Sequence, residues 1–526
     1  MQLAERLVDV LGATVVSIDP LDCELSASDI YSAGATPAAV VRPTDTAELS
    51  LAVRTATAAG AAVVPRGGGV SYTGGVVAPA TDTVVIDTSS MDRILEIDAD
   101  AMFVTVEVGC TWQALWEALG ARGLRTPFFG PLSGSKATVG GSVSQGAALW
   151  GSGRYGTSAD SVLGLEVVLA DGTVLSTGMG AVGDATPSFR NFGPDLTGPF
   201  LGDAGALGIK ATVTLRLMRT PAASGFATYT FDDRHELVDA IAELARADLA
   251  ASGFALDPAL TEQRIRRGSL AQGIDAVREM VGRSDRKLGA IRDAVRMAAK
   301  GRGFLAPDTY TLHLLAEGRS QAAVDADLEA IAAICAAGTP AEPTVPQLLA
   351  SRPFASLTSA LGPEGQRWAP LHVLVPVSEA NSTCDRIDGW LQHHAAQMAE
   401  HHIEAGYMLS SISTTTMLIE LVMIWPGERP AYYDRLVDAS KLKRYPDYED
   451  DPAASQAVAE LRDELVDLFV DVGGAHLQIG RRYRYLDRLD EPTRRLLHDI
   501  KAAVDPHDRI NPGVLGLGKR THEENT

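Results

Sequence analysis

Short apolar runs separated by glycine dominate the first 220 residues. Several of these runs alternate with polar residues or are continuously apolar, which is typical of half-buried or buried strands. We therefore expect strands at Ala39–Val41, Ala62–Val64, Thr83–Ile86, Phe103–Val106 and Leu165–Leu169. A turn at Asp171-Gly172 leads from the last of them into Val174–Ser176.

Helices are few in this region. The pattern predicts helices at Leu3–Leu11 and Thr111–Leu119. A third is expected to begin with Thr46 as its N-cap, to carry Glu48 in its first turn and to run through Ala59.

Longer helical patterns begin near Pro221 and continue to about Gly474, with apolar strands between them. Helices are expected at His235–Asp248, Ile274–Ala299, Gln321–Ala337, Ser378–His402, Ser455–Val470 and, further on, Glu491–Val504. Strands are expected at Phe226–Phe231, Thr309–Leu315, Leu371–Val377 and Tyr407–Gly427. The three prolines of Gly338–Leu349 predict a loop. These changes divide the chain into residues 1–221, 222–470 and 471–526.

The composition indicates a globular protein and argues against a nucleic-acid partner. Hydrophobic residues make up 46% of the 526 residues and charged residues 21%, so the chain has enough apolar material for a globular core. Acidic residues outnumber basic ones by 67 to 46, which gives a net charge of −21. Such a charge repels phosphate backbones and anionic bilayers, so we expect no nucleic-acid partner.

The cysteines and the apolar stretches indicate the cellular compartment of the protein and whether it spans a membrane. The four cysteines contain no CxxC pair, which argues against a disulfide framework and a zinc site and suits a reducing compartment. The N-terminal segment lacks the apolar core of a signal peptide. The most apolar late stretch, Met417–Trp425, is shorter than the roughly 20 residues of a spanning helix. We expect a cytoplasmic protein without a membrane span.

Four glycine-rich segments carry the candidate chemistry. Pro65–Gly75 holds five glycines, at a density that allows backbone N–H groups to approach a phosphate closely or simply builds a flexible turn. It matches neither the Walker pattern nor a dinucleotide fingerprint. The other three segments are Gly130–Leu175, Gly193–Leu217 and Asp505–Gly518.

Taken together, in this order and spacing, the four segments resemble the FAD-binding oxidoreductases of the vanillyl-alcohol oxidase and p-cresol methylhydroxylase superfamily. The resemblance implies an α+β fold. It has a bipartite FAD-binding domain of the PCMH type, built from two α/β subdomains, and an α+β cap domain that covers the reactive side of the flavin. FAD is the implied cofactor, and the cap, here about Ala222–Val470, is where the substrate is selected.

The resemblance also implies residue roles. The pyrophosphate would be wrapped by Arg66, Gly67, Gly68, Gly69, Val70, Ser71, Tyr72, Gly74 and Gly75. The flavin ring and ribityl chain would be lined by Ser135, Thr138, Gly140, Gly141 and Gly146, and this wall would continue through Gly153, Tyr155 and Gly156. Gly205, Gly208 and Ile209 would hold the adenine side, and Asn511 would return to the flavin from the end of the chain.

Two subfamilies offer comparisons for the substrate half. Some D-2-hydroxy-acid dehydrogenases carry a metal motif of the form HxxDGNxH, but Tyr407–Gly427 has no histidine, so we expect no metal. Their Glu-His pair after a late Gly-Gly is also missing from Gly473–Tyr485, although His476 lies nearby.

Phenol-oxidising members offer the other comparison. Trp368–Ser378 is similar to the segment through which several of them attach FAD covalently, which makes His372 either a flavin ligand or a core histidine. Tyr483-Arg484 is similar to their phenolate-binding pair, with Tyr72 as a third partner. However, the chain has no acidic residue between Gly123 and Asp160, where these enzymes place one near the flavin.

The segment Gly473–Tyr485 is the best site candidate outside the glycine loops. A histidine takes a hydroxyl proton and an arginine clamps a carboxylate or phenolate, so His476, Arg482, Tyr483 and Arg484 are the candidate catalytic residues. The alternative is a solvated strand edge that pairs with acidic groups. Glu420, inside an apolar strand, either faces a cavity or points to solvent.

The function implied is an FAD-dependent oxidation of the CH–OH group of a small organic alcohol or 2-hydroxy acid, with hydride transfer to flavin N5. O2 or an electron carrier would reoxidise the flavin. One alternative is an oxidase of para-hydroxylated aromatic alcohols with FAD bound covalently to His372. Another is a flavin-binding protein without turnover. The sequence leaves the substrate, the acceptor and the choice between monomer and homodimer open.

Overall fold

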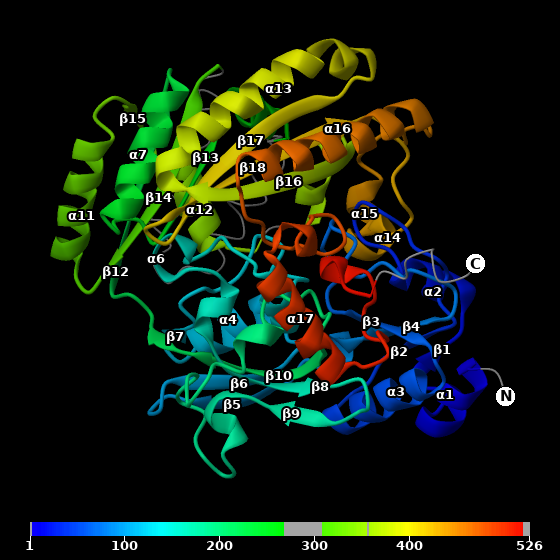
Figure 1. The fold of residues 1–526 in the computed structure, drawn as a ribbon. Helices are drawn as coiled ribbons and strands as arrows, with labels where there is room; N and C mark the ends of the chain where they lie inside the picture. The colour runs from blue at the N-terminus through cyan, green and yellow to red at the C-terminus, as the bar shows by residue number, and fades with distance from the viewer. Residues whose placement is uncertain (1–2, 268–307, 355–356, 519–526) are drawn as a thin grey trace.

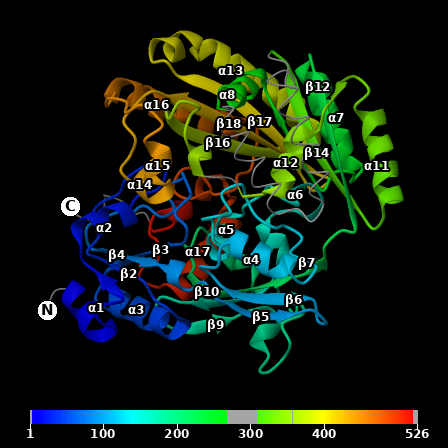
Figure 2. The same cartoon turned by 180° about the vertical axis from the view of Figure 1, so that it is seen from behind.

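The computed structural model describes residues 3–267, 308–354 and 357–518, which fold into two parts stacked on one another (Figures 1 and 2). One part contains two sheets formed by the first 216 residues, together with the end of the chain. The other contains a single large sheet covered by helices. The boundary predicted at 221 lies between the strands Met218–Arg219 and Ala223–Phe231, and the one predicted at 471 is the last residue of the helix Pro452–Asp471. The division into three segments stays a prediction.

A four-stranded sheet begins the first part, in the order β1 (Val16–Ser17), β2 (Ala39–Val41), β4 (Thr83–Asp87) and β3 (Ala62–Arg66). Strands β2, β4 and β3 are parallel, and α3 (Thr46–Ala58) makes the crossover from β2 to β3. The N-cap of α3 is Asp45, whose side chain accepts a hydrogen bond from the N–H of Glu48. The expected N-cap, Thr46, was wrong by one residue because the carboxylate before it makes the capping bond.

The second sheet has five antiparallel strands, with β10 at its centre. Their order is β5 (Ile94–Asp98), β6 (Phe103–Glu107), β10 (Ile209–Arg216), β8 (Val162–Val168) and β9 (Val174–Ser176). Helix α5 (Val139–Gln145) packs on β6 and β10, and α4 (Trp112–Gly120) lies nearby, whereas α6 (Ser152–Tyr155) contacts strands of the second part. Two further short strands, β7 (Leu124–Arg125) and β11 (Met218–Arg219), pair with each other.

The end of the chain returns to the first sheet. The described chain begins with helix α1 (Leu3–Leu11). Strand β3 follows early in the sequence, yet its residue Val63 pairs with Ile510 near the other end of the chain. The N–H of Val63 donates to the carbonyl of Arg509 at 2.7 Å, and the N–H of Asn511 donates to the carbonyl of Val63 at 2.7 Å. Helix α17 (Glu491–Val504) precedes this return. The two ends of the polypeptide therefore share one sheet edge.

The second part is a seven-stranded antiparallel sheet. Its order is β15 (Thr339–Ala341), β12 (Ala223–Phe231), β14 (Tyr310–Gly318), β13 (Ser252–Leu256), β17 (Glu404–Ile412), β18 (Thr416–Trp425) and β16 (Arg367–Pro376). The single strand expected at Tyr407–Gly427 is wrong: it is the hairpin β17–β18, whose polar turn contains Ser413 at φ 56°. The loop expected at Gly338–Leu349 instead contains β15 and begins α12 (Thr344–Ser351).

Helices cover the outer face of this sheet (Figure 1). They are α7 (Arg234–Arg246), α11 (Gln321–Ile334), α13 (Ala380–Glu400) and α16 (Pro452–Asp471). Buried side chains such as Leu237, Ile387 and Phe469 fill the layer between helices and sheet. The inner face carries α8 (Pro258–Arg267) and α12 and turns toward the first part. The helix predicted at Ile274–Ala299 lies outside the described residues.

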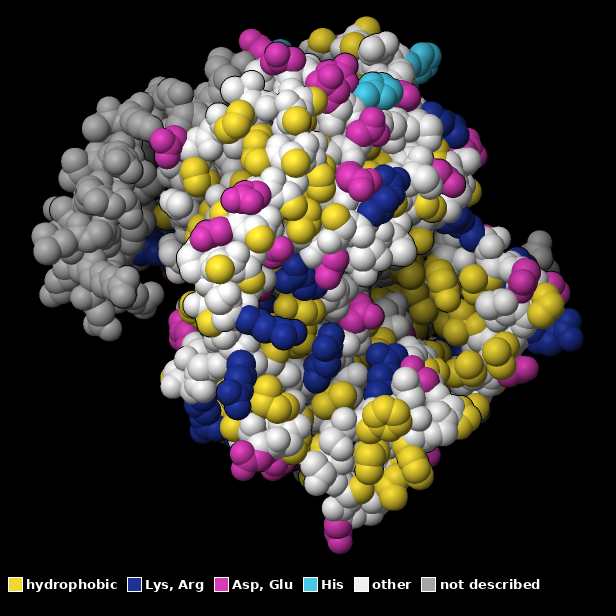
Figure 3. Space-filling view, turned by 90° about the vertical axis from the view of Figure 1, so that its left-hand side faces the viewer, with side chains coloured by type: hydrophobic (Ala, Val, Ile, Leu, Met, Phe, Trp, Pro, Cys, Tyr) yellow, Lys and Arg dark blue, Asp and Glu magenta, His cyan; other side chains and the backbone are white. Residues whose placement is uncertain are grey.

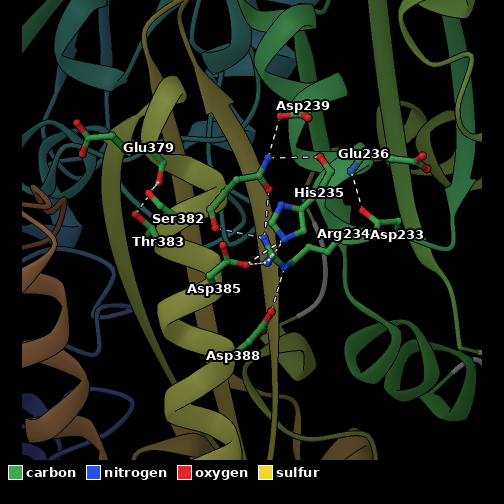
Figure 4. Close-up of polar contacts among 11 residues, drawn as sticks. Asp233, Arg234, His235, Glu236, Asp239, Glu379, Ser382, Thr383, Asp385 and Asp388 are labelled. Carbon is green, nitrogen blue, oxygen red and sulfur yellow. Dashed lines mark hydrogen bonds and ion pairs between the residues drawn. The ribbon is translucent and has the colours of Figure 1, made fainter.

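Arg234, the first residue of α7, ties α7 to α13 (Figure 4). Its Nε donates to Asp388 Oδ2 at 3.0 Å, and its Nη2 contacts Asp385. Nearby, Asn381 Nδ2 donates to Asp239 Oδ1 at 2.8 Å. These contacts fix the positions of two helices that cover the sheet, so the sheet's inner face is backed by a rigid layer.

The surface charge is unevenly distributed. On the face shown in Figure 3, Lys and Arg side chains gather in a band across the middle, while Asp and Glu side chains are spread over the upper half. The net charge of −21 therefore does not make this face uniformly acidic. Among the described helices, none combines the length and the apolar composition needed to cross a membrane.

One buried ion pair joins the two parts. Arg125 on β7 donates from Nη1 to Glu317 Oε1 on β14 at 2.9 Å, and its guanidinium lies 4.7 Å from the centre of the Phe129 ring. The two paired side chains are only 7% and 8% exposed. Because both charges are buried, removal of either side chain alone would leave the other as an unpaired buried charge and lower the stability of the fold.

We predict that Arg125→Met lowers the free energy of unfolding by about 3–5 kcal/mol, because Glu317 is left as an unpaired buried charge. The double variant Arg125→Met/Glu317→Met should recover most of this loss. Urea unfolding followed by circular dichroism measures both. The exposed pair Arg246–Glu243 supplies the control, since Arg246→Met should cost less than about 1 kcal/mol. A single Arg125 variant as stable as the control would contradict the prediction.

Candidate active site

A cavity of about 370 Å³ lies between the glycine loops of the first part and the inner face of the seven-stranded sheet. This volume is within the usual range of ligand sites, about 300–1,000 Å³. One wall comes from the loops after β3 and before α5, and from the segment before β10. The opposite wall comes from β13, β16, β17 and β18.

The glycine loops meet at backbone contact. A Cβ atom on Gly68 would lie 1.9 Å from the carbonyl oxygen of Lys136, and one on Gly67 would lie 2.4 Å from Thr138 Oγ1. Both distances are too short for a side chain, so only glycine allows the segment Pro65–Gly75 to pack against the segment that begins α5. The sequence predicted flavin contacts in both segments, and the fold brings them side by side.

Backbone donors point to an anionic ligand here. The N–H groups of Gly67, Gly68, Gly69 and Val70 make no hydrogen bond to another described residue. All four residues line the cavity. A run of consecutive amide donors beside a cavity matches the needs of a pyrophosphate, whose oxygens accept such bonds.

Most of the predicted cofactor residues line this cavity. These are Arg66, Gly67, Gly68, Gly69, Val70, Ser71, Tyr72, Gly75, Thr138, Gly140, Gly141, Gly205, Gly208, Ile209 and His372. Seven others are not part of its lining: Gly74, Ser135, Gly146, Gly153, Tyr155, Gly156 and Asn511. Their roles as direct flavin contacts stay predictions.

The segment around α6 faces the second part rather than the cavity. A Cβ atom on Gly153 would lie 2.6 Å from the carbonyl oxygen of Ala250, which shows how closely α6 approaches the connection before β13. Tyr155 lies within 5.9 Å of the guanidinium of Arg125, in the contact between the two parts. The cavity wall is formed instead by the preceding residues Ala147–Leu149.

Asn511 fastens the loops to each other from behind the cavity wall. Its Nδ2 donates to the carbonyls of Gly75 and Ala204, both at 2.9 Å. Its Oδ1 accepts from Arg481 Nη2 at 2.9 Å, and Arg481 also donates to the carbonyls of Gly74 and Pro512. One buried amide thus connects the first glycine segment, the third and the end of the chain.

Two cationic side chains line the glycine-loop wall, and both already have partners. Arg66 Nη1 donates to the carbonyls of Ser26 and Ser28 at 2.9 and 2.7 Å. Lys210, which the sequence analysis missed, forms a buried ion pair with Asp203. Burial lowers the pKa of Lys210, and Asp203 opposes that shift. The signal that could have identified it is a lysine inside the apolar strand β10.

The opposite wall follows the two-residue period of β18. Leu418, Glu420, Val422 and Ile424 line the cavity, whereas the residues between them are buried in the core on the other face. The structure therefore answers the question left open for Glu420: its side chain belongs to the cavity. Across the sheet, Glu420 pairs in register with His372 on β16.

A hydrogen-bonded chain crosses from the first part to this wall. Gln478 Nε2 donates to Tyr72 Oη at 3.0 Å, and Tyr72 Oη donates to Glu420 Oε2 at 3.3 Å. Burial, reinforced by Glu420, raises the pKa of Tyr72 well above its usual value. The tyrosine therefore keeps its proton and presents a neutral hydroxyl beside a carboxylate.

His372 is held in place at both ring nitrogens. Its Nε2 lies 2.8 Å from the carbonyl oxygen and 3.0 Å from the nitrogen of Leu477, and its Nδ1 lies 3.4 Å from Tyr483 Oη. Its backbone N–H donates to the same Tyr483 hydroxyl at 2.8 Å. Burial is the main cause that lowers the pKa of His372 to about 3, so the imidazole is neutral at pH 7.

The predicted catalytic residues lie one layer behind the cavity wall. His476 Nδ1 donates to the carbonyl of His372 at 2.9 Å, and its ring stacks on Tyr483 with centroids 4.0 Å apart. Burial lowers the pKa of His476 to about 4. Arg482 pairs with Asp463 at 2.8 Å on α16, away from the cavity.

Arg484 is the most exposed member of this group. Its Nη2 pairs with Asp467 at 2.6 Å, and the side chain is 52% exposed. None of His476, Arg482, Tyr483 and Arg484 is part of the cavity lining. Their direct contact with the substrate stays a prediction. In the structure His476 and Tyr483 support His372, and the two arginines pair with Asp463 and Asp467. Within the described residues, no three His, Cys, Asp or Glu side chains are grouped to hold a metal.

Two family models match the chain. Residues 37–178 match the FAD binding domain, and residues 439–515 match the C-terminal domain of FAD linked oxidases. These ranges contain the first two glycine segments and the segment that returns to the first sheet.

Curated relatives match part of this chain. Glycolate oxidase subunit GlcD of Bacillus subtilis is 32% identical over 223 residues, 41% of this chain and 45% of that protein. A probable mitochondrial D-2-hydroxyglutarate dehydrogenase of Oryza sativa is 38% identical over 182 residues, 34% of this chain and 30% of that protein. Mitochondrial D-lactate dehydrogenase [cytochrome] of Arabidopsis thaliana is 32% identical over 237 residues, 45% of this chain and 40% of that protein. The matches therefore span less than half of these relatives' lengths.

Solved structures match almost the whole chain. p-Cresol methylhydroxylase with substrate bound has a TM-score of 0.74 at 18% identity and covers 98% of this chain and 96% of its own. 4-Ethylphenol oxidase from Gulosibacter chungangensis has a TM-score of 0.70 at 16% identity, with the same coverage. Alkyldihydroxyacetonephosphate synthase has a TM-score of 0.68 at 16% identity and covers 97% and 85%. At such identities, the likeness establishes a shared fold.

We predict that Gly68→Ala weakens FAD binding at least tenfold, because its Cβ would displace the loop from the carbonyl of Lys136. Titration of apoprotein with FAD, read from flavin fluorescence, measures the affinity. Gly120→Ala is the matched control, since nothing lies within 4 Å of a Cβ atom at that position. Equal FAD affinity of the two folded variants would show that the close packing of the loops does not matter for binding.

Proposed function

The chain belongs to the FAD-linked oxidase family, and on this premise we propose that it oxidises the CH–OH group of a small organic alcohol or 2-hydroxy acid. One observation carries the proposal. The cavity is lined by the amide-bearing residues Gly67–Val70 and also by three polar side chains that hydrogen-bond one another, Tyr72, Glu420 and Gln478.

The residues present fit FAD. The amides of Gly67–Val70 would hold the pyrophosphate, the segment Thr138–Gly141 would support the ring and ribityl chain, and Gly205–Ile209 would support the adenine side. When bound, FAD supplies a two-electron acceptor for the hydride that leaves the substrate carbon. The remaining requirements fall to the protein: orientation of the hydroxyl, removal of its proton and exclusion of water.

Three polar side chains where the two parts meet are suited to these requirements. Tyr72 and Gln478 are placed to hydrogen-bond the substrate hydroxyl, and Glu420 Oε2 is placed to take its proton. The apolar side chains around Glu420 exclude water. His476 is not part of the cavity lining. Its contribution is to hold His372 in place at the wall, through the hydrogen bond to the His372 carbonyl.

The names of the relatives support a hydroxyl-bearing substrate, since they refer to glycolate, D-lactate and D-2-hydroxyglutarate. The D-lactate dehydrogenase carries cytochrome in its name, which supports an electron carrier as the acceptor beside O2. Several relatives are mitochondrial, so a cytoplasmic location for this chain stays a proposal. A homodimer stays a proposal as well.

We predict that the FAD-loaded protein loses its flavin absorption near 450 nm when it is mixed anaerobically with at least one member of a panel of alcohols and 2-hydroxy acids. The expected cause is hydride transfer from the substrate carbon. Readmission of O2, or of a cytochrome, then identifies the acceptor. A panel without any effect on the flavin would instead support a flavin-binding protein without turnover.

The second candidate, oxidation of para-hydroxylated aromatic alcohols with FAD linked to His372, is favoured by the position of His372 on the cavity wall. Because the protein hydrogen-bonds both ring nitrogens of this residue, we predict a noncovalent flavin. Acid precipitation of the holoprotein should leave all flavin in the supernatant, as it should for the control variant His372→Gln. Yellow colour retained by the native pellet, and absent from the pellet of His372→Gln, would establish the covalent bond.

A further inference from the structure

The inner face of the seven-stranded sheet carries an apolar part of the cavity wall beside the polar group of Tyr72, Glu420 and Gln478. Aliphatic side chains form it, and we call them the apolar subsite: Leu256, Leu260, Leu349, Met408, Val422 and Ile424. All of them belong to or pack against one hydrophobic cluster, which is distinct from the cluster that fills the layer under the outer helices. The apolar subsite is therefore a small core of its own that borders the cavity.

The strand register places the apolar subsite directly beside Glu420. Across the sheet, Leu256 on β13 pairs with Met408 on β17, and Met408 pairs with Glu420 on β18. Along β18, Val422 and Ile424 follow at the two-residue period of the cavity face, which places them about 7 and about 13 Å from Glu420 along the strand. A molecule with its hydroxyl at Glu420 therefore reaches Met408 across the strands and Val422 and Ile424 along them.

Helices α8 and α12 form the opposite side of the apolar subsite (Figure 2). A Cβ atom on Gly406, the register partner of Val422, would lie 3.0 Å from Leu260 Cγ. The glycine in β17 thus allows α8 to approach the sheet closely. Leu260 lines the cavity from α8 and Leu349 lines it from α12, so hydrocarbon bounds this part of the cavity on two sides.

Such a wall favours a hydrocarbon ligand. Water is released when apolar surface covers aliphatic side chains, and the complex is stabilised in proportion to the area buried. The polar side chain one helical turn from Leu260 is Gln263, and its Nε2 donates to Glu404 Oε2 at 3.3 Å. Glycolate has no carbon chain beyond its carbinol carbon and lactate has a single methyl group, so either molecule would leave Val422 and Ile424 uncovered.

Resting on the proposed function, we propose that the substrate is an alcohol or 2-hydroxy acid with an aliphatic body, and that the apolar subsite binds this body. The body has about six carbons or more, the length that spans the distance from Glu420 to Val422. In the reaction the O–H proton passes to a side chain of the polar group. The C–H hydrogen leaves with its electron pair as hydride to FAD, and the C–O bond becomes C=O.

Two homologous series test the proposal. FAD-loaded protein is mixed anaerobically with 1-butanol, 1-hexanol or 1-octanol, and with 2-hydroxybutanoate, 2-hydroxyhexanoate or 2-hydroxyoctanoate. The second-order rate constant of flavin reduction is measured for each compound. In any series that reduces the flavin, we expect this constant to rise about threefold for each added CH2 group, because each buried CH2 group stabilises the complex.

Three variants locate the effect. Val422→Phe and Leu349→Phe each fill part of the apolar subsite and should lower the rise to less than about 1.5-fold for each CH2 group, since longer bodies lose their space. Leu349 is only half-buried, so its variant gives the answer if Val422→Phe does not fold. Val174→Phe is the matched control and should keep the native rise, because Val174 is 41% exposed on β9, outside the cavity lining.

A binding measurement covers variants that reduce too slowly for the kinetic comparison. The affinities of butanamide, hexanamide and octanamide, read from changes in flavin absorption, then give the dependence on chain length. We expect the native protein and Val174→Phe to bind octanamide most tightly. The two cavity variants should bind the three amides with similar affinities.

The outcomes separate this proposal from the function on which it rests. Flavin that neither these series nor the wider panel of alcohols and 2-hydroxy acids reduces overturns the proposed function itself. Flavin that only compounds without an aliphatic chain reduce, or a rate that does not rise with chain length, overturns the substrate class while the oxidation of CH–OH groups stands. A native rise that persists in Val422→Phe and Leu349→Phe removes the apolar subsite as its cause.

Discussion

The architecture depends on one buried amide, that of Asn511. The Asn511 side chain donates hydrogen bonds to the carbonyls of Gly75 and Ala204. Arg481 donates to the amide oxygen and so fixes the orientation of the amide. A buried carbonyl without a donor costs about 1–3 kcal/mol, so the bonds fix the relative positions of three loops. These loops are each more than a hundred residues apart in sequence, yet together they form the wall against which a dinucleotide would lie. The segment around Ile510 must therefore return beside β3, because only there can Asn511 reach both carbonyls.

Much of the fold could be predicted from the sequence. The α+β class and FAD as the cofactor, both implied by the resemblance of the four glycine segments to a known family, are confirmed. Strand and helix positions are mostly right to within a few residues. The errors have local causes: Asp45 competes with Thr46 for the cap, and the apolar residues on both sides of Ser413 hide a hairpin inside what reads as one strand.

The substrate side was harder to predict because its residues are distant in sequence. Glu420, Tyr72 and Gln478 come from three segments that only the folded chain brings together. The conspicuous group from His476 to Arg484 attracted attention by its composition, but the segment runs behind the wall and uses its polar groups to satisfy Asp463, Asp467 and the backbone of His372. Residue type alone does not tell whether a polar side chain faces a cavity or supports its wall.

The alternation along β18 gives adjacent positions two different roles. Met417, Ile419, Leu421 and Met423 hold the lobe together from one face, whereas Leu418, Glu420 and Val422 meet the cavity from the other. A mutation on the second face changes chemistry without disturbing the packing that the first face maintains. Single substitutions on the cavity face are therefore separable from the residues of the other face and from the flavin-binding loops.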